Sequence, residues 1–422
     1  MCARMTSADN TAASQRYARS RSKTRGPVRA YEAFAVKKLL RAMGEPRVRL
    51  QLWDGSYFGA PESDVVGTIE IHHRRAFYHL LRQRELGFGD HYTAGGIDVS
   101  GDLVNVLTEI FSCKEKVASS SKTFLERLNK KRRANHTQAH AKHNIYHHYD
   151  VSNAFYRLWL DQEMQYTCAY FPDPNLTLEQ AQEAKMDHIS RKLFLKPGDR
   201  VIEAGCGWGG LARYMAVKYG AKVTAYNISR EQVQYARERA RSEGYDDSVT
   251  YIEDDYRNIR GECDAFVSVG MLEHVGQANY SVLGDVVDRV LTKNGHGLVH
   301  TIGRNQPRQM SAWIDQRIFP GAYPPTLQEM MDIFQGHAFS VLDVENLRLH
   351  YARTLTHWLA RYEAANEVIS EMFDNTFIRA WRLYLAGSVA TFLSGALQLF
   401  QVAFVRGQNN RLPWSRQHLY TQ

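Results

Sequence analysis

The stretch Val201–Leu211, VIEAGCGWGGL, decides the fold, because it joins a short apolar segment, one acidic residue and a run of glycines just before a helical pattern. Val201 and Ile202 are typical of a buried parallel strand, and Glu203 is expected near its carboxyl end. Glycines let the backbone approach a ligand where a Cβ would collide. Because ligands of open α/β sheets bind outside the carboxyl ends of the strands, this turn predicts the floor of a nucleoside site.

The spacing of the glycines separates two classes of nucleotide-binding turn. A dinucleotide fingerprint needs G-x-G-x-x-G and an acidic residue about 20 positions later. In this chain the order is G-C-G-W-G-G from Gly205 to Gly210, with Glu203 ahead of the turn. That order fits the S-adenosylmethionine loop of class I methyltransferases better than a nicotinamide site. Close packing of a helix on a strand is the alternative explanation of a lone glycine-rich turn.

The segments that follow supply the rest of a doubly wound sheet. Helical and strand patterns alternate, which indicates parallel βαβ units with right-handed crossovers. The expected strands are Ala221–Ser229, Val249–Ile259 with its loop, the start of Cys263–Gly276, and His296–Gly303, and the helix after the first of them is Arg230–Gly244. The predicted fold class is therefore α/β, a Rossmann-like class I S-adenosylmethionine-dependent methyltransferase, with a small N-terminal domain.

Long strings of residues outside the glycine turn narrow the class further. From about Asn144 to Arg406 the chain contains, in this order, HHYDVSNAFYRLWLDQEMQYTCAYF, VIEAGCGWGGLARYMA, ISREQ, DDYRNI, SVGMLEHVG, HTIG, IFPGAYPP, DVENLRLHYARTL and WRLYLAGSVATFLSGALQLFQVAF. These strings, in their order, resemble the cyclopropane-fatty-acyl-phospholipid synthases, with their mycolic acid cyclopropane synthase and fatty-acid methyltransferase relatives.

The resemblance implies a reaction and a base. The methyl group of S-adenosylmethionine passes to the cis double bond of an unsaturated phospholipid acyl chain, and a bound bicarbonate ion removes the proton whose loss closes a cyclopropane ring. The implied bicarbonate ligands are the side chains of Cys168, Glu273, His300 and Tyr351 and the backbone of Ile302. Cys, His and Tyr can donate to an anion, and Glu can accept the bicarbonate proton. Relatives with nearly the same motifs stop after methylation and leave a methyl- or methylene-branched chain, and this alternative stays open.

The same resemblance implies the cofactor contacts. They are Tyr166 and Thr167 across the methionine end, Gly205 and Gly207 beneath it, and Asn227, Ile228, Gln232, Asp255 and Tyr256 around the ribose and adenine. Class I methyltransferases generally end the second strand with an acidic residue for the ribose hydroxyls, whereas this chain has Asn227 there. The resembled family also lacks the acid.

Each catalytic candidate also has a purely structural interpretation. Cys168 could be a small buried apolar side chain. His300 could be a core histidine, Tyr351 a packing residue, and Glu273 with His274 a cap of the following loop. Only their joint placement inside the family's strings favours catalysis.

Charge and composition indicate an enzyme that meets an anionic surface. The 422 residues carry a net charge of +8 and are 44% hydrophobic, enough for one large and one smaller domain. Positive charge gathers in Met1–Ala30 and in KKRR at Lys130–Arg133. We favour an anionic bilayer over nucleic acid, since no nucleic-acid motif is recognisable and the resembled family acts on membrane lipid. A merely solvated tail is the alternative for residues 1–28.

The cysteines and histidines predict neither a disulfide framework nor a metal site. The 5 cysteines are far apart and form no C-x-x-C pair, so a reducing compartment is expected. Zinc-ligand spacing is absent, although His136, His140 and His143 lie at helical spacing. Met1–Arg16 lacks the apolar region of a signal peptide. We therefore expect a cytoplasmic enzyme associated peripherally with the inner face of the membrane.

The predicted domains are a disordered basic tail (1–28), a small N-terminal domain (29–118), a basic linker (119–143) and the catalytic domain (144–422). Strands are expected within Val48–Gly59 and Asp64–His73, and the resemblance alone suggests lipid positioning or a homodimer contact for this small domain. Leu383–Val405 is uncharged and long enough to span a bilayer, yet its polar residues predict a buried helix to about Leu393 and then a strand.

Two segments are expected to cover the acyl chain. One is the loop and helix of Ile318–Met330, and the other is a single amphipathic helix over Thr354–Phe373. The apolar surface would come from four aromatic residues, Trp313, Phe319, Tyr323 and Trp358.

Overall fold

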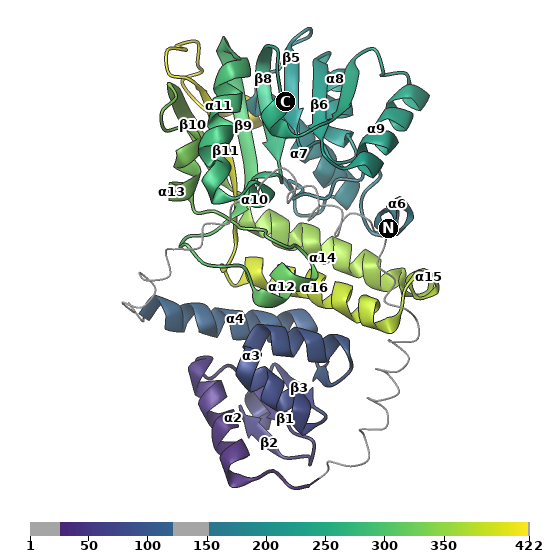
Figure 1. Cartoon of the computed structure of the whole chain (residues 1–422), viewed down its shortest axis with the longest axis vertical. Helices are drawn as coiled ribbons and strands as arrows, with labels where there is room; N and C mark the ends of the chain where they lie inside the picture. Colours follow the sequence, from purple (N-terminus) through teal and green to yellow (C-terminus); the bar gives the residue numbers. More distant parts are fainter. Residues whose placement is uncertain (1–25, 121–151, 421–422) are drawn as a thin grey trace. The chain divides into compact units, whose positions relative to one another are not determined.

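The structure, a computed structural model, describes residues 26–120 and 152–420 (Figure 1). Residues 1–25 of the basic tail, most of the predicted linker, and His136, His140 and His143 lie outside the described residues, so what the sequence predicts for them stays a prediction. Contacts divide the chain into two compact units. The first unit combines the residues up to Ser121 with the later segment Phe373–Leu383. The second unit contains the remaining residues.

The first unit contains a four-stranded sheet in the strand order β2-β1-β3-β4, with helices packed against it. Its strands are β1 (Val48–Gln51), β2 (Tyr57–Gly59), β3 (Gly67–Ile71) and β4 (Ile97–Ser100), and its helices are α2 (Ala30–Ala42), α3 (Arg74–Thr93) and α4 (Leu103–Ser120). Val36, Leu50, Ile69 and Phe77 belong to its apolar core. Arg379 joins the segment Phe373–Leu383 to this unit by an ion pair of 2.6 Å with Asp98.

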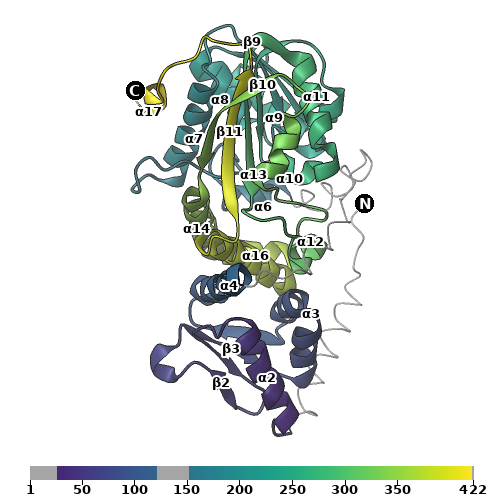
Figure 2. The same ribbon diagram turned by 90° about the vertical axis from the view of Figure 1, so that its left-hand side faces the viewer.

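The second unit contains a seven-stranded sheet in the order β10-β11-β9-β8-β5-β6-β7. The strands are β5 (Arg200–Ala204), β6 (Lys222–Asn227), β7 (Val249–Glu253), β8 (Cys263–Val269), β9 (Leu291–Gly303), β10 (Phe339–Asn346) and β11 (Gln398–Arg406). β9, β8, β5, β6 and β7 pair in parallel. β11 lies antiparallel between β9 and β10 (Figure 2). The predicted α/β class is confirmed, with one antiparallel strand near an edge.

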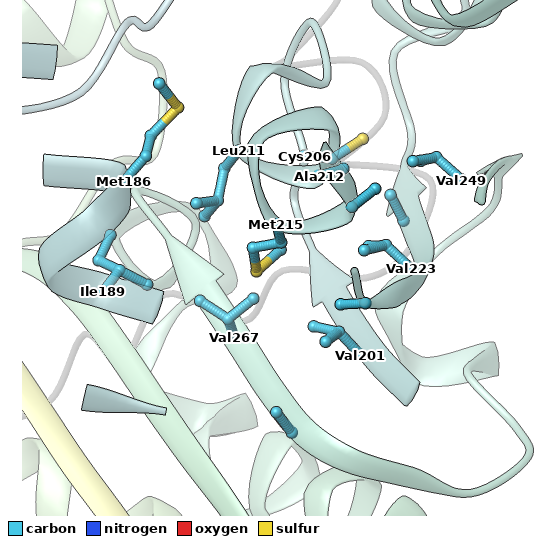
Figure 3. Close-up of a cluster of buried hydrophobic side chains, with 14 of the residues drawn as sticks. Met186, Ile189, Val201, Cys206, Leu211, Ala212, Met215, Val223, Val249 and Val267 are labelled. Atoms are coloured by element: carbon cyan, nitrogen blue, oxygen red, sulfur yellow. The ribbon is translucent and has the colours of Figure 1, made fainter. Parts of the chain in front are cut away.

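Helices cover both faces of this sheet, because its central strands are buried on both sides. α7 (Leu178–Lys192), α8 (Gly210–Tyr219) and α9 (Arg230–Glu243) pack on one face, where Ile189, Met215, Val201 and Val267 belong to a continuous apolar cluster (Figure 3). The opposite face packs against α11 (Tyr280–Val290), with Leu283 and Val287 contributing to a second apolar cluster. This two-sided packing fixes the carboxyl ends of β5, β6 and β8, from which the site is built.

The remaining helices lie before, between and after the strands of the seven-stranded sheet along the chain. They are α6 (Asn153–Arg157), α10 (Leu272–Val275), α12 (Ala312–Arg317), α13 (Leu327–Met330), α14 (Arg348–Ala364), α15 (Asn366–Met372), α16 (Asn375–Leu393) and α17 (Gln417–Tyr420). The single helix predicted over Thr354–Phe373 is wrong, because the chain leaves helical geometry at Ala365 and α15 begins at Asn366. Leu383–Val405 forms the end of α16 and then β11, as expected. Within the described residues, every helix is too short or too polar to cross a bilayer.

Candidate functional site

The glycine turn between β5 and α8 adopts a backbone that only glycine takes easily. Gly205, Gly207 and Gly209 have φ values of 86°, 53° and 82°. A Cβ at Gly209 would lie 2.5 Å from the hydroxyl oxygen of Tyr251, so this glycine is needed for packing. A Cβ at Gly207 would meet no atom of the described residues within 4 Å. Gly207 therefore faces open space at the carboxyl edge of the sheet.

That space is a pocket, and all nine residues predicted to contact the cofactor line it. They are Tyr166, Thr167, Gly205, Gly207, Asn227, Ile228, Gln232, Asp255 and Tyr256. Sequence reasoning missed other lining residues, among them Gln165, Trp208, Met271 and His274. Each of these residues lies inside a motif already quoted from the sequence. The motif therefore indicated the region of the pocket, and only the individual side chains were missed.

Asn227, where many methyltransferases have an acid, braces the glycine turn. Its Nδ2 donates to the carbonyl oxygen of Gly207 at 3.2 Å and to Oε1 of Gln232 at 2.8 Å. Its Oδ1 accepts from the backbone N–H of Ser229 at 3.2 Å. A carboxylate cannot donate, so only the amide can hold the turn and the start of α9 in this way.

The two residues expected near the adenine, Asp255 and Tyr256, differ in whether their polar atoms already have hydrogen-bond partners. The Asp255 carboxylate accepts from Nε and Nη2 of Arg257 at 2.7 and 2.8 Å, so its oxygens are already engaged. The hydroxyl of Tyr256 is buried and has no hydrogen-bond partner among residues 26–120 and 152–420. An orphaned buried hydroxyl at the edge of a glycine-floored pocket fits a ligand with polar edges, as a nucleoside has.

A buried lysine that the sequence did not single out contacts two residues that line the pocket. Nζ of Lys185 donates to Oγ1 of Thr167 at 2.9 Å and to Oε1 of Gln165 at 2.5 Å. Burial lowers the pKa of Lys185 to about 8 and raises the pKa of Glu203, which also lines the pocket, to about 7. The only feature of the sequence that could have predicted its role is that Lys185 lies on the inward face of the helical pattern preceding β5.

Three of the five catalytic candidates adjoin residues that line the pocket. Cys168 follows Thr167, Glu273 precedes His274, and the carbonyl oxygen of His300 accepts from the N–H of Gly270 at 2.9 Å. Oε1 of Glu273 accepts from the N–H of Ile302 at 2.6 Å. Oε2 of Glu273 and Nε2 of His300 are buried and, among the residues that the structure describes, have no hydrogen-bond partner.

Leu347 joins the remaining candidates to this group through its backbone. Its carbonyl oxygen accepts from the Cys168 thiol at 3.9 Å and from the N–H of Tyr351 at 3.1 Å. Its N–H donates to Leu399, which pairs with Ile302 in the β9–β11 ladder. Backbone hydrogen bonds and strand pairing thus connect all five catalytic candidates in one cluster, although none of the five lines the pocket.

Burial sets the protonation of this cluster. It raises the pKa of Glu273 to about 7, partly offset by the hydrogen bond from Ile302. Burial, reinforced by the charges of Lys185 and Lys192, lowers the pKa of His300 to about 3, so its imidazole is neutral at physiological pH. Burial also raises the pKa of the Cys168 thiol. The cluster therefore holds a neutral imidazole and a carboxyl group whose pKa lies close to neutral pH.

Aromatic rings connect the cofactor pocket with this cluster. The ring of Tyr166 lies 5.4 Å from that of Trp358, which lies 6.0 Å from that of Tyr351. The segment Ile318–Met330, expected to cover the acyl chain, reaches the cluster where the N–H of Tyr323 donates to the carbonyl oxygen of Glu273 at 2.8 Å. Trp313 and Trp358 are buried, and Phe319 packs against His274 and Tyr384. The environment is apolar and rich in π-faces.

Comparison with known proteins assigns both parts of the chain. The family model of mycolic acid cyclopropane synthetase matches residues 136–402, and a domain of unknown function matches residues 35–122. A probable fatty acid methyltransferase of Pseudomonas putida is 37% identical over 88% of this chain and 96% of its own length. The cyclopropane-fatty-acyl-phospholipid synthase of Escherichia coli is 42% identical over 64% of this chain and 69% of its own length.

Solved structures agree with the fold. The mycolic acid cyclopropane synthase CmaA1, in complex with SAH and CTAB, is 28% identical, with a TM-score of 0.59 over 62% of this chain and 97% of that one. Since the family model covers well over half of the chain, the chain belongs to the mycolic acid cyclopropane synthetase family and is an S-adenosylmethionine-dependent methyltransferase.

Proposed function

We propose that this enzyme transfers the methyl group of S-adenosylmethionine to the cis double bond of an unsaturated phospholipid acyl chain and closes a cyclopropane ring. The cofactor supplies an electrophilic methyl group on a sulfonium, and the nine pocket residues named above would hold it. In this step, the alkene π-electrons form the new carbon–carbon bond. The electron pair of the broken carbon–sulfur bond stays on sulfur, which becomes a neutral thioether. Loss of a proton from the transferred methyl group then lets its carbon–hydrogen electron pair close the ring.

The observation that carries the proposal is the pair of orphaned polar atoms beside the pocket. Oε2 of Glu273 and Nε2 of His300 are both buried and, among the described residues, both without a hydrogen-bond partner. Leaving such a group unpaired costs about 1–3 kcal/mol each, so a ligand that pairs both is favoured. A bicarbonate ion has the acceptor oxygens for His300 and the hydroxyl for Glu273.

The surroundings suit a carbocation intermediate. The rings of Tyr166, Trp358 and Tyr351 succeed one another from the pocket to the cluster. Each aromatic face attracts a cation by about 0.5–2 kcal/mol, the upper value applying where water is excluded. Burial of Tyr351 and Trp358 keeps water from capturing the cation before the base removes its proton.

We also infer that the enzyme works at an anionic membrane surface, with the outward face of α2 as one contact. This α2 face consists of Tyr31, Phe34, Lys37, Lys38 and Arg41, which recur at helical spacing. Phe34 is 66% exposed and Tyr31 54% exposed, and the three cations are exposed as well. The one acidic residue inside the helix, Glu32, is buried and paired with Arg74. Aromatic rings flanked by cations complement lipid headgroups and the acyl boundary beneath them.

The test is incubation with vesicles of unsaturated phospholipid and S-adenosylmethionine carrying a trideuterated methyl group, followed by mass spectrometry. A cyclopropane retains two of the three deuterium atoms and resists mild hydrogenation. A methyl-branched alkene retains all three, and a methylene branch retains two but takes up hydrogen. Either branched product would replace ring closure by simple methylation, and unmodified lipid would overturn the proposal.

The role of bicarbonate is tested by the same assay in carbonate-free buffer. Turnover should fall and return when bicarbonate is added, whereas affinity for the cofactor should stay constant. Turnover that does not depend on added bicarbonate would assign the proton to another base.

A further inference from the structure

A buried chain of polar side chains runs from His300 through β11 to α7. Gln401 lies directly opposite His300 in the β9–β11 ladder and is fully buried. Its Nε2 lies 3.0 Å from Nδ1 of His300. Its Oε1 accepts from Nζ of Lys192 at 2.8 Å. Lys192 is held in turn by Oε2 of Glu345 at 2.6 Å.

The chemistry of Lys192 settles which way the Gln401 amide points. An ammonium group can only donate, so the amide atom that faces Lys192 must be the oxygen. The NH2 group of Gln401 then faces His300, and Nδ1 of His300 must accept its hydrogen bond. A second carboxylate, that of Asp343, lies 3.6 Å from the same Nζ and forms a second ion pair with it.

A neutral imidazole that accepts at Nδ1 carries its hydrogen on Nε2. Nε2 of His300 is the atom that is buried without a hydrogen-bond partner among residues 26–120 and 152–420. The hydrogen-bonded chain therefore leaves His300 with a donor, rather than a lone pair, at its unpaired buried nitrogen.

We propose that Gln401, oriented by Lys192, is a positioning residue that fixes His300 as the Nε2–H tautomer, so that His300 donates a hydrogen bond to an oxygen anion. The anion is the bicarbonate of the proposed function, on which this inference rests. With the other tautomer, an imidazole lone pair would face the anion and repel it. Gln401 itself is not among the residues that line the pocket.

The direct test is nitrogen-15 NMR of histidine-labelled wild-type protein, with the His300 signals assigned by their loss in His300→Asn. A hydrogen on Nε2 and a bare Nδ1 are expected. A hydrogen on Nδ1 would overturn the inference, and this measurement needs no variant of Gln401 and no bicarbonate.

Gln401→Glu changes the donor to an acceptor with almost no change of shape. Its carboxylate can accept from both Lys192 and His300, so the hydrogen of His300 should move to Nδ1. Turnover should fall about 100-fold, the range for losing one donor to a catalytic anion. The dissociation constant of S-adenosylmethionine should change less than about threefold, since the pocket residues are untouched.

Gln398→Glu is the matched control. Gln398 is on the same strand, is buried, and accepts from Asn346 and donates to Gly395, at 2.9 and 2.8 Å. It should lower stability to a similar extent while leaving the His300 tautomer and most turnover intact. Equal loss of turnover in the two variants would reduce Gln401 to a structural role. If His300 carries its hydrogen on Nε2 but turnover does not depend on bicarbonate, bicarbonate is not the base. The assignment of the His300 tautomer is then still correct.

Discussion

The backbone N–H of Ile302 donates to Oε1 of Glu273 at 2.6 Å, which ties β9 to the short helix α10. This bond uses one carboxyl oxygen and leaves Oε2 buried without a partner among the residues that the structure describes. Glu273 is thereby held in place by the backbone, with one of its two carboxyl oxygens unpaired.

Glu273→Gln should separate catalysis from cofactor binding. The amide oxygen can still accept from Ile302, but the neutral side chain cannot serve as a carboxylate acceptor for bicarbonate. We expect turnover to fall about 100-fold with the dissociation constant for S-adenosylmethionine changed less than about threefold. Single-turnover kinetics and calorimetry measure the two. Equal losses of turnover and of affinity for S-adenosylmethionine would show that Glu273 does not act with the base.

The same substitution should stabilise the protein at alkaline pH. The pKa of Glu273 is raised by burial to about 7, so the folded state holds a proton that the unfolded state has already released. Stability contributed by this group is therefore lost as pH rises from the ordinary carboxyl pKa towards 7. Urea unfolding should show Glu273→Gln more stable than wild type by about 1–3 kcal/mol at pH 8, with little difference at pH 4. A constant difference across this range would contradict the buried, unpaired carboxylate.

Two glycines of the same turn should respond differently to alanine. Gly207→Ala places a methyl group in the open pocket, so S-adenosylmethionine affinity should fall at least about tenfold, with roughly 1 kcal/mol lost from folding for its positive φ. Gly209→Ala meets the Tyr251 ring and should cost more stability. Calorimetry and thermal unfolding distinguish them. Unchanged cofactor affinity in Gly207→Ala would place the cofactor elsewhere.

Asn227→Asp tests the departure from the usual acidic residue. The carboxylate would face the carbonyl oxygen of Gly207 and the amide oxygen of Gln232 without a hydrogen to donate. We expect cofactor affinity to fall about tenfold, measured by calorimetry. Asn409→Asp is the control, since its buried amide likewise donates to a carbonyl, that of Asn294. Tighter cofactor binding in Asn227→Asp would show that an acid serves the ribose better.

The α2 face should govern binding to vesicles. Lys37→Glu with Lys38→Glu should weaken cosedimentation with anionic vesicles at least about tenfold, since each basic residue near the surface contributes about 1 kcal/mol. Phe34→Ser should weaken it at every salt concentration. Lys222→Glu with Lys293→Glu reverses the same charge at exposed positions of the second unit. If both double variants lose binding equally, attraction is due to net charge and the α2 face has no special role.

The sequence predicted the elements that are specified locally and missed those that depend on distant partners. The glycine turn, β5 to β9 and the change from α16 to β11 follow from glycine placement, short apolar runs and alternation. The break at Ala365 was missed because alanine favours helix and only the local fold ends α14 there.

The role of Gln401 was also out of reach from the sequence. A lone glutamine in the apolar run of β11 is visible, but its partner His300 is set by the insertion of β11 between β9 and β10. That pairing spans 101 residues of chain. Similarly, nine cofactor candidates could be predicted through family motifs, whereas Lys185 and Lys192 carry no motif and are buried on α7 only because that helix packs against the sheet.

The position of β11 has a consequence for synthesis on the ribosome. The strands that shape the glycine turn are translated before β11, so Gln401 reaches its place opposite His300 only after all of them have emerged. A truncated product could fold its nucleoside-binding half and sequester the methyl donor while lacking an oriented imidazole. Nonsense mutations upstream of this strand are therefore expected to yield idle, cofactor-trapping fragments wherever proteolysis spares them.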